Sequence, residues 1–172
     1  MSDKTTWAID PTHSEVSFKV KHMMISTVTG YFKKFDATID SVDDAFKNAS
    51  FNVEIDIASI DTKNDDRDKH LMSEDFFNVE SFPKMTFASK SFDGDKLIGD
   101  LTIRNTTKEA ALDVDFNGIA VDPYGQTKAG FEMKGSIDRK AYGLTWSAVT
   151  EAGNIVVSDE VKLIIDAQFI KK

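Results

Sequence analysis

The sequence predicts an all-β protein, and two observations support this prediction. Apolar and polar side chains alternate in eight segments, which is the period of strands with one buried face. The three prolines lie outside these segments, so they interrupt no predicted ladder. Such strands suit a two-sheet sandwich or a closed barrel. Long strands with a phenylalanine-rich inward row favour an eight-stranded antiparallel β-barrel with one shared interior.

The first predicted strand has the clearest alternation and covers residues 14–24, after a lead-in at 7–9. Its inward parity holds Val16, Phe18, Val20, His22 and Met24. The same reasoning predicts strands at 31–39, 51–57, 85–91, 97–104, 110–116, 131–137 and 161–169. Short connections between residues 85 and 137, with turn signals at Asp93-Gly94 and Asp122-Pro123, predict a meander of four strands.

The segment 64–79 breaks this alternation. It begins with Asn-Asp-Asp, which favours a helix N-cap, and then places Leu71, Met72, Phe76 and Phe77 at helical spacing. We therefore expect a short helical segment that caps one end of the barrel. Because no repeat or linker-like composition divides the chain, we expect one domain over residues 1–172.

The composition excludes several classes of protein. Acidic residues outnumber basic ones by 29 to 21, and the resulting net charge of -8 disfavours nucleic acid as a partner. No apolar run is long enough for a transmembrane segment, and residues 1–7 hold no apolar leader, so we expect a cytoplasmic location. The absence of cysteine excludes disulfides, thiolate zinc sites and thiol nucleophiles.

The polar candidates for chemistry are few, and each leaves alternatives open. His22 shares the inward parity of its strand, where it is either a polar anchor inside a cavity or a core histidine bonded to backbone. Arg67, Asp68 and His70 form either a solvated helix face or a barrel rim that binds the polar end of a ligand. The three histidines have no metal-ligand spacing, so we expect no metal site. Asp10, His13 and Ser14 are sequence neighbours that suit a turn and a cap better than a catalytic triad, so we expect no catalytic residue.

Several short motifs follow one another in a recognisable order. They are Asp10-Pro11-x-His13-Ser14, Lys21-His22, Thr29-Gly30-x-Phe32, Arg67-Asp68-x-His70-Leu71, Asp75-Phe76-Phe77, Phe82-Pro83 and Arg139-x-x-Tyr142-Gly143-Leu144-x-Trp146. In this order they resemble the YceI-like family of bacterial lipid-binding proteins over roughly residues 7–169. The resemblance implies an extended, lipocalin-like barrel around an apolar tunnel that holds a polyisoprenoid or isoprenoid quinone. It also implies a homodimer, a role in stress response and no cofactor besides the bound lipid.

Parity and resemblance together give the expected ligand-binding residues. They are Phe18, Val20, His22, Met24, Phe32, Phe51, Val53, Ile55, Arg67, Asp68, His70, Leu71, Phe76, Phe87, Leu101, Phe116, Phe131 and Leu163. By the resemblance, the polar end of the ligand would meet His22, Arg67, Asp68 and His70.

Two alternative functions stay open at the level of the sequence. One is an enzyme that acts on an isoprenoid or fatty-amide head group, with His22 or His70 as acid or base. The other is a barrel whose phenylalanines only fill the core.

Overall fold

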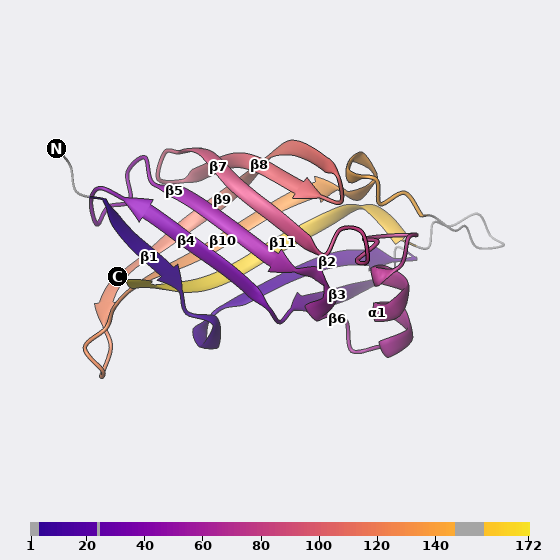
Figure 1. Ribbon diagram of the computed structural model, residues 1–172, viewed down its shortest axis with the longest axis horizontal. Coiled ribbons are helices and arrows are strands. Elements are labelled where there is room, and N and C mark those ends of the chain that lie inside the picture. The colour runs from indigo at the N-terminus through magenta and orange to yellow at the C-terminus, as the bar shows by residue number, and fades with distance from the viewer. Residues whose placement is uncertain (1–3, 24, 147–156) are drawn as a thin grey trace.

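The computed structural model describes residues 4–23, 25–146 and 157–172. The chain forms an elongated barrel with a short helix at one end and both termini at the other (Figure 1). The elements in chain order are β1 (Thr5–Ile9), η1 (Pro11–His13), β2 (Glu15–His22), β3 (Ser26–Phe32), β4 (Phe35–Ser41), β5 (Ser50–Asp56), η2 (Ile57–Ser59), β6 (Ile60–Asp61), α1 (Asp65–Met72), β7 (Lys84–Phe92), β8 (Lys96–Ile103), β9 (Thr106–Val121), β10 (Thr127–Asp138), η3 (Arg139–Tyr142) and β11 (Val157–Lys171).

All strand pairings among the described residues are antiparallel, and a ring of eight strands closes the barrel. The ring runs β1-β4-β5-β7-β8-β9-β10-β11 and returns to β1, where Trp7 lies opposite Lys171. Farther along β11, β2 takes the place of β1, β3 pairs with β2, and β6 pairs with β3. Thus β1 and β2, β3 and β4, and β5 and β6 are consecutive parts of three interrupted strands. The prediction of an eight-stranded antiparallel barrel is confirmed.

The ring has a gap at the end that carries the helix. Among the described pairings, β6 pairs with β3 and with no other strand. The ladder between β5 and β7 ends at Lys84, the first residue of β7, so no described strand pairs with the other edge of β6. The chain between β6 and β7, which includes α1, lies at this end of the barrel (Figure 1). The expected cap is therefore present, and it lies where the sheet opens.

Two predicted element boundaries differ from the structure. Residues 31–39 form two strands instead of one, because Lys33 and Lys34 lie between β3 and β4 and both donate backbone hydrogen bonds to Ser59. The other concerns only the end of the helix, since the segment 64–79 was predicted to hold a short helix or helical turns and holds a short helix followed by turns. The Asn64 side chain caps α1 as predicted, by accepting a bond from Arg67 N, but the helix ends at Met72 and turns follow.

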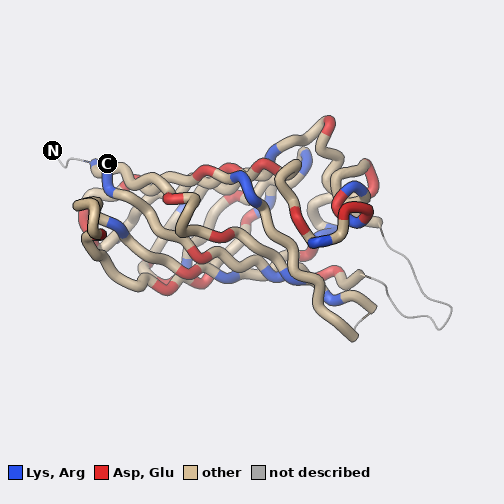
Figure 2. The backbone as a smooth tube through the Cα atoms, turned by 90° about the horizontal axis from the view of Figure 1, so that it is seen from below, with Lys and Arg blue, Asp and Glu red and all other residues tan. Residues whose placement is uncertain are grey.

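The remaining strands follow the predicted alternation except on β9, where Phe116 was predicted inward and is 39% exposed. The meander β7-β8-β9-β10 is confirmed, and charged residues are distributed along the strands of the barrel (Figure 2). One backbone contact constrains the sequence closely, because the Phe18 ring lies directly over Gly30 on the neighbouring strand. A Cβ at Gly30 would meet the far end of this ring, so a larger residue there would force the Phe18 side chain to move.

Candidate functional site

Two chambers occupy the interior of the barrel. The inner chamber, nearer the termini, is a narrow cavity of about 60 Å³ lined by Val16, Phe51, Phe87 and Leu97, among others. The outer chamber, nearer α1, is a cavity of about 70 Å³ lined by residues that include Phe18, Leu71, Phe76 and Ile137. Phe32, Met85 and Leu163 line both chambers, and we call these three residues the waist.

The strand register shows that the chambers lie end to end along the barrel axis. On β11, Phe169 and Ile165 line the inner chamber, whereas Val161 lines the outer one. On β8, Leu101 faces the inner chamber and Ile103 the outer one. On both strands, the residues on one side of the waist line the inner chamber and those on the other side line the outer chamber. The waist therefore marks the boundary between the chambers along the barrel axis.

The walls of both chambers are apolar. The described residues expose no polar atom to either chamber. In the described structure, Ser17 is the one hydroxyl residue that lines the inner chamber. Its Oγ donates a hydrogen bond to the Ile164 carbonyl oxygen at 3.2 Å. Since a cavity holds water only where polar groups can bond it, these chambers suit an apolar ligand.

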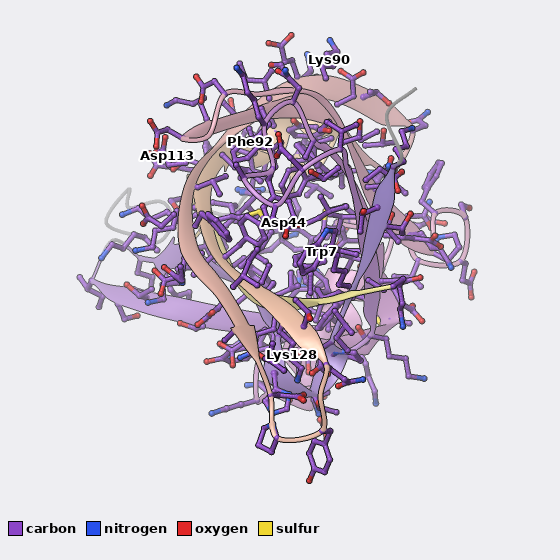
Figure 3. All side chains as sticks on the ribbon, turned by 90° about the vertical axis from the view of Figure 1, so that its left-hand side faces the viewer. Trp7, Asp44, Lys90, Phe92, Asp113 and Lys128 are labelled. Carbon is purple, nitrogen blue, oxygen red and sulfur yellow. The ribbon has the colours of Figure 1, made fainter. Side chains whose placement is uncertain are left out.

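An aromatic cluster closes the end of the barrel beyond the inner chamber. Phe131 is fully buried and lies 5.1 Å from Phe46, 5.8 Å from Phe51 and 5.1 Å from Phe116, measured between ring centroids. Trp7 packs on Phe46 at 5.0 Å, and its ring lies inside the barrel when the molecule is viewed from this end (Figure 3). Phe116 and Phe131 therefore belong to this cluster and line neither chamber.

The opposite end is built from α1, the turns after it and the residues around η3. The His70 imidazole donates a 2.9 Å hydrogen bond from Nε2 to the Asp75 carboxylate. Its ring lies edge-on to Trp146 at 4.9 Å and to Phe76 at 5.1 Å. Phe76 lines the outer chamber, so His70 stands one layer behind the apolar wall at this end.

Arg139 is a buried cation beside the outer chamber, at 3% exposure. Its guanidinium donates to four backbone carbonyl oxygens, those of Ser158 at 2.9 Å, Leu144 at 2.6 Å, Trp146 at 2.7 Å and Val157 at 3.3 Å. Burial lowers the pKa of Arg139, and Asp159 partly opposes that shift. Arg139 thus links the segment after η3, at Leu144 and Trp146, to the start of β11, at Val157 and Ser158.

Two of the predicted polar residues have structural partners instead of facing the cavity. Asp68 is buried and accepts from the backbone N of Thr62 at 2.9 Å and from its hydroxyl. Arg67 Nε donates to the same hydroxyl at 2.8 Å, and its Nη2 donates to the Thr62 carbonyl oxygen. The pair joins α1 to the end of β6, and neither residue lines a chamber.

The other predicted ligand-binding residues divide by location. Eleven of them line the chambers in the described structure, namely Phe18, Val20, Leu71 and Phe76 in the outer one, Phe51, Val53, Ile55, Phe87 and Leu101 in the inner one, and Phe32 and Leu163 in both. His22 is half-buried at the end of β2 and lines neither chamber. Met24 lies outside the described residues.

Several residues that line the chambers are absent from the predicted set, although the alternation in the sequence indicates them. Met85 precedes Phe87 by two positions, and Ile165 and Val161 flank Leu163 in the same way, so strand parity alone places them inward.

In the described residues, no cluster of His, Asp or Glu could hold a metal ion. The described part of the chain also contains no helix long and apolar enough to span a membrane.

Comparison with known proteins agrees with this architecture. The model of the YceI-like domain matches residues 7–169. The chain belongs to the YceI-like family. A UPF0312 protein of Staphylococcus epidermidis is 40% identical over 166 residues, which cover 96% of this chain and 97% of that protein.

Solved structures share the YceI-like barrel. The YceI protein of Campylobacter jejuni is 36% identical and superposes with a TM-score of 0.74, covering 88% of this chain and 90% of that one. A polyisoprenoid binding domain from Saccharophagus degradans, implicated in plant cell wall breakdown, superposes with a TM-score of 0.72 over 96% of this chain and 98% of that one. At 12% identity, this second likeness is one of fold alone.

Proposed function

We propose that this YceI-like protein binds a long-chain apolar lipid, a polyisoprenoid or isoprenoid quinone, inside the barrel and carries or stores it. The observation that supports the proposal most is the pair of apolar chambers joined end to end at the waist. An elongated apolar space matches a chain better than a compact molecule. The Saccharophagus degradans domain, named for polyisoprenoid binding, has the same fold and adds support.

The energetics favour a long tail. Each methylene group transferred from water into an apolar environment contributes about 0.8 kcal/mol, so ten of them contribute about 8 kcal/mol. The cost of association is of similar size, at about 4–15 kcal/mol. Tight binding therefore requires a long tail that runs through both chambers. Because these hold only about 60 and 70 Å³, the apolar side chains that line them would move apart to admit it.

The same proposal assigns binding and no catalytic step. His70 lies on α1 behind Phe76, and the rings of Phe76 and Trp146 pack edge-on against its imidazole. An enzyme acting on the head group would need His70 or His22 to reach that group. If His70→Ala abolished turnover of an isoprenoid or fatty amide and left binding intact, the enzymatic alternative would replace the carrier proposal.

A titration with an isoprenoid quinone tests the carrier proposal. Phe18→Asp places a charge in the outer chamber, whereas Lys19→Glu places one on the exposed face of the same strand. We expect Phe18→Asp to lose binding, because an unpaired buried charge is costly, and Lys19→Glu to bind like the wild type. Equal loss in both variants would contradict the proposed location, and a wild-type protein that neither binds the quinone nor gains thermal stability from it would contradict the function.

We further propose that the protein forms a homodimer through the free edge of β9. The β8 ladder covers β9 as far as Asp113, and Val114 N donates to the Asp95 carbonyl oxygen at 2.8 Å. In the described structure, the residues of β9 after Val114 have ladder pairs with β10 alone. Along this edge Phe116, Ile119 and Val121 are exposed at 39%, 38% and 67%. An exposed apolar edge strand readily pairs with another strand.

The charges along this edge suit a second copy of the same strand. Residues 116–121 carry no charge, and Asp115 and Asp122 flank them. In a symmetric antiparallel pairing centred on Gly118, each Asp115 would face Val121 of the second copy, so no two aspartates would lie opposite each other. This arrangement would extend the sheet between two barrels.

Molar mass by light scattering after size-exclusion chromatography tests the dimer. We expect the double variant Ile119→Lys and Val121→Lys to be monomeric, because lysine at an edge opposes pairing. Val42→Lys, at another exposed apolar position, is the matched control and should leave the dimer intact. A monomeric wild type, or equal dissociation of both variants, would contradict the proposal. A cytoplasmic location and a role in stress response remain predictions, which cell fractionation and a deletion strain would test.

A further inference from the structure

The waist residues differ from the rest of the chamber lining in their position, because they lie at the boundary between the two chambers. Phe32, Met85 and Leu163 come from β3, β7 and β11, which are separate parts of the barrel wall. Each of them borders both chambers, so a ligand that occupies both must pass among these three side chains. All three are apolar, so the passage offers no hydrogen bond to a polar substituent on the tail.

From this geometry we infer that the waist selects the ligand by the width and length of its tail, so that the protein takes lipids with one flexible chain and no second tail or fused ring. This inference rests on the proposed lipid-binding function. Two-tailed lipids and fused-ring sterols would have to place a wider group between Phe32, Met85 and Leu163. A single chain passes with its narrowest dimension across the waist.

The side chains of the waist differ in how freely they can change conformation. Phe32 is buried at 4% exposure and packs against the rings of Phe18 at 5.6 Å and Phe77 at 6.3 Å, so its position is held from two sides. Met85 is unbranched and has three rotatable bonds, which lets it adapt to a chain that passes. We therefore expect Met85 to respond to the methyl branches of an isoprenoid, while Phe32 keeps the outline of the passage.

The chambers also predict how affinity depends on chain length. Each methylene that leaves water raises affinity about fourfold. A chain short enough for the outer chamber gains this factor until that chamber is filled, and only a chain that passes the waist continues to gain. The aromatic cluster around Phe131 then sets the final limit, because it closes the far end.

A homologous series of straight-chain fatty alcohols, titrated by calorimetry, tests the inference. Leu163→Trp fills the waist, and Lys162→Trp adds the same bulk on the exposed face of the same strand. We expect the wild type and Lys162→Trp to gain about fourfold per methylene through the whole accessible length. Leu163→Trp should bind the shortest members as the wild type does and stop gaining at a shorter chain.

Widening the waist gives the opposite result. Met85→Ala removes the pliable side chain, and we expect this variant to gain at least tenfold in affinity for a sterol or a diacylglycerol, relative to the wild type. If Leu163→Trp does not fold, as judged by its melting curve, Met85→Trp takes its place in the length series. Both substitutions act at the waist, so both should shorten the chain at which the gain stops.

The outcomes separate this inference from the proposed function. A wild type that binds no alcohol of any length overturns both. A wild type that binds the series, together with a waist variant whose length dependence is unchanged, overturns the role of the waist and leaves the lipid-binding function standing. Wild-type affinity for a two-tailed lipid equal to that for a single chain would also overturn the role of the waist.

Discussion

Replacing Arg139 tests whether its guanidinium holds the helix end of the barrel together. Arg139→Met preserves much of the apolar stem and removes donors to the carbonyl oxygens of Leu144, Trp146, Val157 and Ser158. The bond to Leu144 is buried, and a buried group left without its partner costs about 1–3 kcal/mol. The other carbonyls are partly buried and can recover some hydration, so we expect a total loss of about 3–5 kcal/mol, the range for breaking a buried charged network.

Thermal and urea unfolding measure this loss. For a domain of this size, each kcal/mol lowers Tm by about 2–4 °C, so Arg139→Met should lower it by about 10 °C. Lys140→Met is the matched control, because Lys140 makes an exposed ion pair with Asp159 at 3.3 Å and such pairs contribute about 0–1 kcal/mol. If the two variants lost the same stability, Arg139 would not hold these segments together.

Two further predictions concern stability away from the chambers. The hydrogen bond from Lys128, followed by those from Thr12, holds the pKa of the Asp10 carboxyl well below its ordinary value. Its contribution is therefore present above the unfolded pKa of about 3.9 and lost as the pH falls below it, so urea unfolding should find Asp10→Asn less stable than the wild type at neutral pH and nearly equal to it in strong acid. Gly30→Ala should destabilise by about 1–3 kcal/mol, because the new Cβ meets the Phe18 ring, and adding Phe18→Leu should recover part of that loss; additive losses in the double variant would contradict this contact.

The sequence predicted well what depends on strand parity. Val16, Phe18 and Val20 alternate with charged or polar neighbours, and the structure turns all three inward, because successive side chains of a strand point to opposite faces. Parity failed where the backbone departs from a regular strand. The β9–β10 ladder shifts register beside Phe131, and Phe116 lies in the aromatic cluster with a partly exposed ring instead of in a chamber.

The polar residues could not be placed by pattern, since their partners come from tertiary contacts. Arg67 and Asp68 have the charge expected of a rim, yet both bond to Thr62, and a fixed offset in sequence does not reveal whether a side chain turns toward a neighbouring loop or a cavity. The break between β3 and β4 depends on Ser59, which is distant in sequence from Lys33 and Lys34. Local propensity carries no information about such a contact.

Organic extraction of the purified protein, followed by mass spectrometry, tests the central claim most directly. The proposed function and the waist together predict that the extract contains a single-chain isoprenoid lipid in near-stoichiometric amount. They also predict that Phe18→Asp, purified in parallel, yields little of it. An extract of the wild type that holds only buffer components, from a protein that also fails to bind an added isoprenoid quinone, would contradict the account.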